Sequence, residues 1–189
     1  GLFAADQKVG DLLEPLNALE PESLNSLPLQ IAWNEARLSQ PKPDLRDIQS
    51  RLEKLQKDLP RESDPSLASY YDYVVALTQR AQAGDSNQTT KNMLAALATG
   101  KKATGAKWSD NNERRELVLQ ILVQQMEKLA PNNSWLLDPN KQISQELRDL
   151  AESAETLATG IPEKALLNLQ ILTATISAAD LLPKIAENA

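Results

Sequence analysis

Cysteine and histidine are both absent from the 189 residues of the sequence. Without cysteine the chain can form no disulfide, no thiol nucleophile and no thiolate metal site. Without histidine it lacks the commonest general base and the commonest metal ligand, and therefore any Ser–His triad. These two absences exclude most familiar enzyme designs and zinc sites. We expect a chain with no catalytic activity, no cofactor and no metal site.

Glycine and aromatic residues are scarce, with six glycines and an aromatic fraction of 4%. Alanine, leucine, glutamine, glutamate and lysine, which all favour helices, are abundant. The sequence has no alternating β-branched run and no Asn-Gly or Asp-Gly hairpin turn. An apolar fraction of 41% and a charged fraction of 24% are ordinary for a globular protein. We therefore predict one soluble all-α domain over residues 1–189.

Positive charge is also limited. The chain has 20 Lys and Arg residues and 26 Asp and Glu residues, which gives a net charge of −6. Phosphate backbones are repelled on average by such a chain, which disfavours nucleic acid binding. The longest apolar stretch, residues 165–182, is interrupted by polar side chains such as Asn168, Gln170 and Asp180. This pattern predicts a buried helix rather than a membrane span.

Proline spacing separates an irregular beginning from a regular remainder. Residues 1–43 contain five prolines, which restrict this part to short helices or turns. From residue 44 onwards helices are expected to be regular. The first of them, over residues 44–59, carries one apolar stripe that predicts packing on one side and ends before Pro60. The stripe consists of Leu45, Ile48, Leu52, Leu55 and Leu59.

Capping residues and glycine or proline stops divide the rest of the chain into helices. Asp64–Pro65, Ser86, Ser109 and Asp138–Pro139 are typical starts, and Gly100 is a typical end. The apolar run within residues 113–129 predicts the most buried helix. We expect seven to eight mostly antiparallel helices, in a bundle or a short stack of helical hairpins. Their expected ranges are 64–84, 86–100, 109–129, 138–160 and 162–183, after the segments described above.

Two short sequences recur in the same order. Leu97–Gly100 is repeated as Leu157–Gly160, and residues 117–122 resemble residues 167–172. This similarity predicts two equivalent helical hairpins, the first with ten extra residues in a loop at 101–110. The alternative is coincidence, because leucine and alanine are common here and helices often end in glycine.

A basic segment is the main candidate binding site. Lys101, Lys102 and Lys107 lie beside Trp108 in an otherwise acidic chain. Such a segment could dock an anionic group or an acidic partner, with the indole as its apolar anchor. The alternative is a solvated linker whose tryptophan folds back onto the core. Tyr73, at the edge of an apolar helix face, is a second candidate, with a buried aromatic side chain as the alternative.

The function that these patterns favour is a non-catalytic helical interaction or scaffold module that binds another protein through its surface. The alternative is a small-ligand-binding bundle, in which Asn168 or Gln170 would line a pocket between helices. A closed polar pocket would favour the ligand binder, and a filled core with an exposed groove would favour the scaffold. Residues 2–5 are interpreted as the remnant of an export signal, which suggests an extracytoplasmic location, or as the first turn of a helix.

Overall fold

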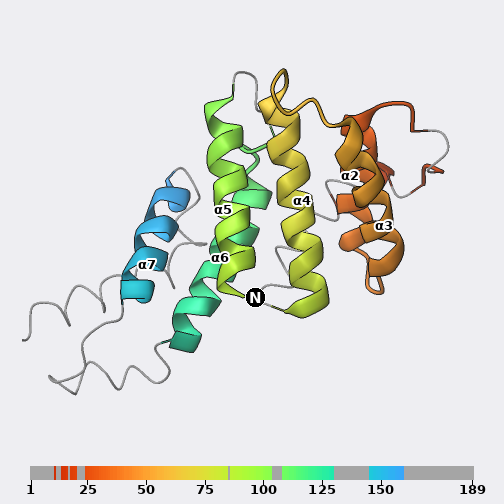
Figure 1. Ribbon diagram of the computed structural model, residues 1–189. Coiled ribbons are helices and arrows are strands. Elements are labelled where there is room, and N and C mark those ends of the chain that lie inside the picture. The colour runs from red at the N-terminus through yellow and green to blue at the C-terminus, as the bar shows by residue number, and fades with distance from the viewer. Residues whose placement is uncertain are drawn as a thin grey trace, which may run out of the picture. The chain divides into compact units, whose positions relative to one another are not determined.

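A computed structural model describes residues 11, 14–16, 18–20, 24–84, 86–103, 108–129 and 145–159. All regular structure within these ranges is helical and none of it is strand, which confirms the predicted all-α fold (Figure 1). The elements are α2 (Leu27–Leu38), α3 (Leu45–Leu55), the 3-10 helix η2 (Gln56–Asp58), α4 (Pro65–Ala83), α5 (Asn87–Lys102), α6 (Asn112–Leu129) and α7 (Gln145–Ala158).

The chain divides into two compact units, Gly1–Val118 and Leu119–Ala189. The boundary falls within the sequence of α6, and a single domain over the whole chain stays a prediction. In the first unit α4 packs most extensively against α5, and α2, α3 and α4 contact one another in pairs. The helix pair α4–α5 is therefore the centre of this unit.

Local sequence explains where several helices begin. The Asp64 side chain accepts a hydrogen bond from the Leu67 backbone N–H at 2.9 Å, so the predicted cap of α4 is confirmed. Ser86 and Thr89 form a capping box at the start of α5, which confirms the second predicted cap. In the proline-rich first part, α2 still reaches 12 residues. It can do so because Pro28 lies in its first turn, where no intrahelical N–H is needed.

The apolar stripe of α3 is buried as predicted at Ile48, Leu52 and Leu55, whereas Leu45 is only half-buried. The predicted end at Leu59 is wrong, because α3 ends at Leu55 and continues only as η2. Leu59 itself is extended, with φ −71° and ψ 123°. The residue before a proline avoids the helical region, which explains why the helix stops short of Pro60.

Two predicted helix boundaries around the basic segment are also wrong. Helix α5 does not stop at Gly100 but runs through it to Lys102. Helix α6 is not capped by Ser109: the Asn111 side chain accepts a hydrogen bond from the Arg114 backbone N–H at 3.0 Å. Asparagine and serine both cap helices well, so the choice between them depends on where the chain turns. Residues 101–110 are therefore not one loop, since Lys101 and Lys102 are helical.

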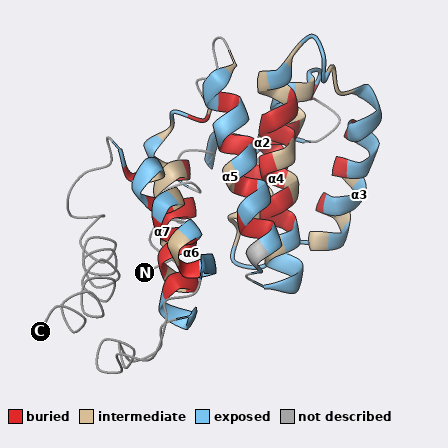
Figure 2. Ribbon diagram, turned by 60° about the vertical axis from the view of Figure 1, so that its left-hand side comes forward, coloured by how far each residue is buried: buried red, intermediate tan, exposed pale blue. Residues whose placement is uncertain are grey.

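The helix over 113–129, which was predicted to be the most buried, is fully buried at its centre. Val118, Ile121 and Leu122 have no exposed surface, and Figure 2 shows buried residues along much of α6. In α7 the predicted inner positions Leu147 and Leu150 are buried. The predicted start at Asp138–Pro139, the stop at Gly160 and the last helix lie outside the described residues, as does the second copy of the hairpin repeat.

The predicted absence of a membrane span agrees with the helices that the structure describes. None of those helices combines the length and the apolar character needed to cross a membrane.

Candidate functional site

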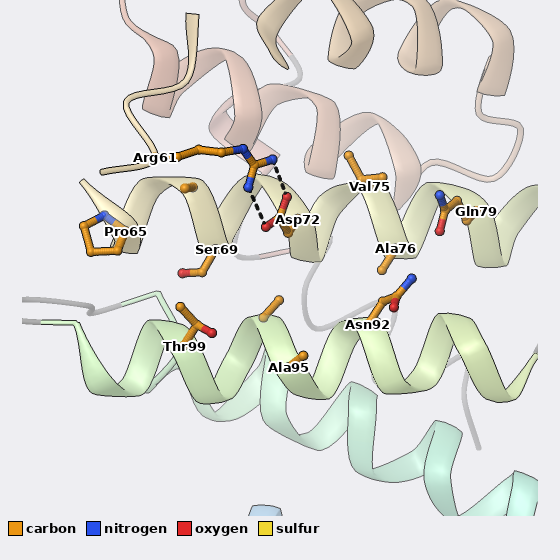
Figure 3. A pocket seen from close by; sticks show the side chains of 12 residues that line it. Arg61, Pro65, Ser69, Asp72, Val75, Ala76, Gln79, Asn92, Ala95 and Thr99 are labelled. Atoms are coloured by element: carbon orange, nitrogen blue, oxygen red, sulfur yellow. Dashed lines mark hydrogen bonds and ion pairs between the residues drawn. The ribbon is translucent and has the colours of Figure 1, made fainter. Parts of the chain in front are cut away.

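A groove with a volume of about 410 Å³ lies between α4 and α5. The two helices run antiparallel beside it, so that Ser69 of α4 lies near Thr99 of α5, and Ala76 near Asn92 (Figure 3). Residues from both helices and from the turn before α4 line it: Arg61, Pro65, Ala68, Ser69, Asp72, Val75, Ala76, Gln79, Asn92, Ala95, Ala96 and Thr99.

The floor of the groove is made of small buried side chains. Ala68, Ala76 and Ala96 are at most 5% exposed, and Ser69 is buried beside them. Short side chains at these positions leave space between the two helices that longer ones would fill. The rim residues Gln79, Asn92, Ala95 and Thr99 are exposed, as are Arg61 and Pro65. The site is thus an open groove over a filled core.

An ion pair lies on the rim at one end of the groove. The two terminal nitrogens of Arg61 donate hydrogen bonds to the two carboxylate oxygens of Asp72 at 2.9 and 3.1 Å (Figure 3). The hydrogen bond to Asp72 raises the pKa of Arg61 despite the opposing effect of burial. Both side chains are nearly half exposed, so solvent screens the attraction. The pair orients the Arg61 side chain at the rim more than it stabilises the fold.

Polar groups elsewhere on the groove are available to a bound molecule. Gln79 makes no hydrogen bond within the described part of the chain. Asn92 uses its side-chain oxygen to accept a hydrogen bond from Gln88 at 2.9 Å, which leaves its NH₂ group as a donor. Ser69 donates its hydroxyl hydrogen to the Ser66 carbonyl at 2.8 Å. The groove therefore offers amide groups near Ala76 and a charged pair near Ser69.

A separate buried cluster joins α2, α4 and the first turn of α6. Arg114 donates hydrogen bonds to the two carboxylate oxygens of Glu35 at 2.8 and 2.7 Å. Tyr70 donates its hydroxyl hydrogen to Glu35 and accepts a hydrogen bond from Arg114 at 3.2 Å. The side chains of Arg114 and Glu35 are only 8% and 1% exposed. Every charged member of the cluster is thus paired inside the protein.

The cluster changes the titration of its members. Burial alone would lower the pKa of Arg114, but the hydrogen bonds and negative charge of Glu35 outweigh it and raise that pKa. Burial and the Glu35 charge raise the pKa of Tyr70 well above its ordinary value of 10.0. Arg114 therefore keeps its positive charge and Tyr70 keeps its proton near neutral pH.

Tyr70 is expected to make the protein less stable as the pH rises above 10. In the unfolded chain an ordinary tyrosine ionises near pH 10, whereas folded Tyr70 keeps its proton, so the folded state binds more protons. The free energy of unfolding should fall by up to about 1.4 kcal/mol per pH unit for this group. Denaturant unfolding followed by circular dichroism measures the free energy of unfolding at each pH. Above pH 10 it should fall less steeply with pH for Tyr70→Phe than for the wild type. Equal slopes in both proteins would contradict the expectation.

The predicted site residues Trp108 and Tyr73 come together, with Tyr73 buried and Trp108 half-buried. The Trp108 ring centroid lies 5.2 Å from that of Tyr70 and 5.4 Å from that of Tyr73. The indole nitrogen donates a hydrogen bond to the Ser66 carbonyl at 3.1 Å. Tyr73 has no exposed surface. The tryptophan is therefore folded back onto the core, and Tyr73 presents no face to a partner in this conformation.

Two lysines of the basic segment belong to the described residues. Lys101 and Lys102 are exposed in the last turn of α5, where positive charge also favours the helix dipole. Lys107 lies outside the described residues. Docking of an anionic partner on these lysines stays a prediction, now without the indole as an exposed anchor.

The groove was not predicted, although the sequence contains a pattern that indicates it. Ala68, Asp72 and Ala76 recur every four residues and share one face of α4, and Asn92 and Ala96 do so on α5. A face of short side chains on each of two neighbouring helices indicates a gap between them.

Within the described ranges no group of three or more acidic side chains is placed to hold a metal ion.

Comparisons with protein-family models, with curated proteins and with solved structures find no match for this chain. The geometry of the groove and the chemistry of its lining are therefore the basis for a function.

Proposed function

We propose that the chain is a non-catalytic helical interaction module that binds a segment of another protein in the α4–α5 groove. The observation that carries this proposal is the open groove of about 410 Å³, with a floor of alanines and an exposed polar rim. A filled core below an open groove is the arrangement expected of a module that acts through its surface.

The shape of the groove favours a helical segment as the occupant. Along α4 the lining extends from Pro65 to Gln79, which at the rise of an α-helix is about 20 Å. Three to four turns of a bound helix cover that length. Its apolar face would pack on the alanine floor, while its polar edges meet Gln79, Asn92 and the Arg61–Asp72 pair, as in other helix-in-groove complexes.

A pair of alanines on α5 allows a matched test. Ala95 lines the groove, and Ala98 is also exposed on the same helix but does not line it. We expect a photo-reactive phenylalanine at position 95, but not at position 98, to crosslink one specific protein in cells of the organism that makes this protein. Calorimetry with that purified protein should then show binding at least about tenfold weaker for Ala95→Trp, a loss of about 1.4 kcal/mol, and unchanged for Ala98→Trp.

The proposal is wrong if Ala95→Trp binds the crosslinked protein as tightly as the wild type does, or if only position 98 crosslinks. Circular dichroism of both tryptophan variants should match the wild type, because each changed side chain starts from an exposed position. This control separates a blocked groove from a misfolded protein.

A small-molecule ligand is the second candidate, because the volume of about 410 Å³ lies within the range typical of ligand pockets. Native mass spectrometry after incubation with a small-molecule extract distinguishes the two candidates. A low-mass adduct on the wild type and on Ala98→Trp, but not on Ala95→Trp, would replace the protein partner with a ligand.

A further inference from the structure

Two arginines from different helices pack on one tryptophan at the α2–α3 pair. The guanidinium carbon of Arg37 lies 5.4 Å from the Trp33 ring centroid, and that of Arg51 lies 5.2 Å from it. Trp33 is 5% exposed, and its indole nitrogen donates a hydrogen bond to the Leu19 carbonyl at 3.1 Å. The ring is therefore held in place, and one guanidinium group from each of the two helices packs on it.

The two arginines differ in how their charge is compensated. Arg51 donates a hydrogen bond from Nε to Asp47 at 2.8 Å. The Arg37 side chain has no ion pair or hydrogen bond within the described ranges, and its Nε–H is buried without an acceptor. A buried donor of this kind costs free energy and usually indicates a bound water or ion. Stacking on an indole does not satisfy it, because the ring face accepts no strong hydrogen bond.

The surroundings of Arg37 are more positive than the chain as a whole. Residues 27–55 contain five Lys and Arg and four Asp and Glu, in a protein with a net charge of −6. Of the four carboxylates, Glu35 is buried against Arg114 and Asp47 is paired with Arg51. Asp44 accepts a hydrogen bond from the Asp47 backbone, and Glu53 accepts one from Gln49. Within the described ranges none of these four carboxylates forms an ion pair or hydrogen bond with the Arg37 side chain.

We infer that Arg37, Trp33 and Arg51 form a binding site for a small oxyanion, a carboxylate or a phosphate group. A guanidinium offers parallel N–H donors that match the oxygens of either group. Because the indole already restrains both arginines, little side-chain entropy is lost when the anion binds. The site lies on α2 and α3, so it is independent of the α4–α5 groove and of the function proposed for it.

The test is a titration of the ¹⁵N-labelled full chain with phosphate or with acetate, at ionic strength held constant with sodium chloride. We expect saturable shifts of the Arg37 Nε–H signal and of the Trp33 indole signal, which are assigned with Arg37→Gln and Trp33→Phe. The two anions distinguish phosphate from carboxylate specificity. For Arg37→Gln the anion affinity, read from the shift of the Trp33 indole signal, should fall by about tenfold or more, since hydrogen bonds to charged groups contribute strongly.

Arg46→Gln is the matched control, because Arg46 is an exposed arginine on α3 that does not pack on Trp33. It should bind the anion as the wild type does, and Arg51→Gln should bind it more weakly. The inference is overturned if neither anion gives a saturable shift, or if Arg37→Gln responds like the wild type. In that case water alone satisfies the Arg37 donor.

Discussion

Arg114→Met is expected to lower the free energy of unfolding by about 3–5 kcal/mol, the usual effect of breaking a buried ion pair. The change leaves the Glu35 carboxylate, which is 1% exposed, without its cation and without two hydrogen bonds from the guanidinium. It also removes the guanidinium hydrogen bond to the Tyr70 hydroxyl. Denaturant unfolding followed by circular dichroism at neutral pH measures the loss.

Arg61→Met is the control, because it removes the same kind of two-point arginine–carboxylate pair from the surface. An exposed pair contributes at most about 1 kcal/mol, so this variant should stay close to the wild type. Replacing Glu35 and Arg114 together with methionine should recover part of the loss, since no unpaired charge remains. If Arg114→Met costs no more than Arg61→Met, the buried cluster is not what holds α2, α4 and the start of α6 together.

Trp108→Ala should lower the free energy of unfolding by about 3 kcal/mol, at the low end for a tryptophan because the side chain is only partly buried. The indole contacts Tyr70 and Tyr73, and its N–H satisfies the Ser66 carbonyl. It also lies directly on α5: a Cβ built on Gly100 would be 2.6 Å from the Trp108 Cζ2 atom.

The same contact predicts that the effect of Gly100→Ala depends on Trp108. In the wild type the added methyl group meets the indole and should destabilise by about 1–3 kcal/mol through overpacking. In the Trp108→Ala background only the Ser109 Cβ stays close, at 3.0 Å from the added methyl group. Gly100→Ala should then destabilise much less, because the helix propensity of alanine, up to about 1 kcal/mol, offsets that remaining contact. A double-mutant cycle measures this coupling. An equal effect of Gly100→Ala in both backgrounds would show that the indole does not determine why glycine is needed there.

The all-α class and several helix starts could be predicted because they depend on residues close together in the chain. Asp64 and Ser86 cap the backbone N–H of a residue three positions later, and any such pair is visible in a sequence. The stripe of α3 was predictable for the same reason, because a helical period places Ile48, Leu52 and Leu55 on one face.

The error at Gly100 arose because glycine fits two different local structures. Glycine suits both a helix end and a close contact inside a helix, and the choice depends on where Trp108 lies. The docking role predicted for Trp108 and Tyr73 likewise rested on a pattern that fits two structures. An aromatic side chain at the edge of an apolar face fits both a surface anchor and a core residue, and only packing distinguishes the two.

The sequence alone therefore determined the all-α class, the caps of α4 and α5, and the central burial of α6, because each depends on periodicity or on neighbours within a few residues. Only the tertiary structure decided that Glu35 and Arg114, 79 residues apart, form a buried pair. It alone brought the small faces of α4 and α5 together as a groove and placed Arg37 and Arg51 on Trp33. Contacts between distant residues depend on how whole helices pack, and no local pattern encodes which helices will meet.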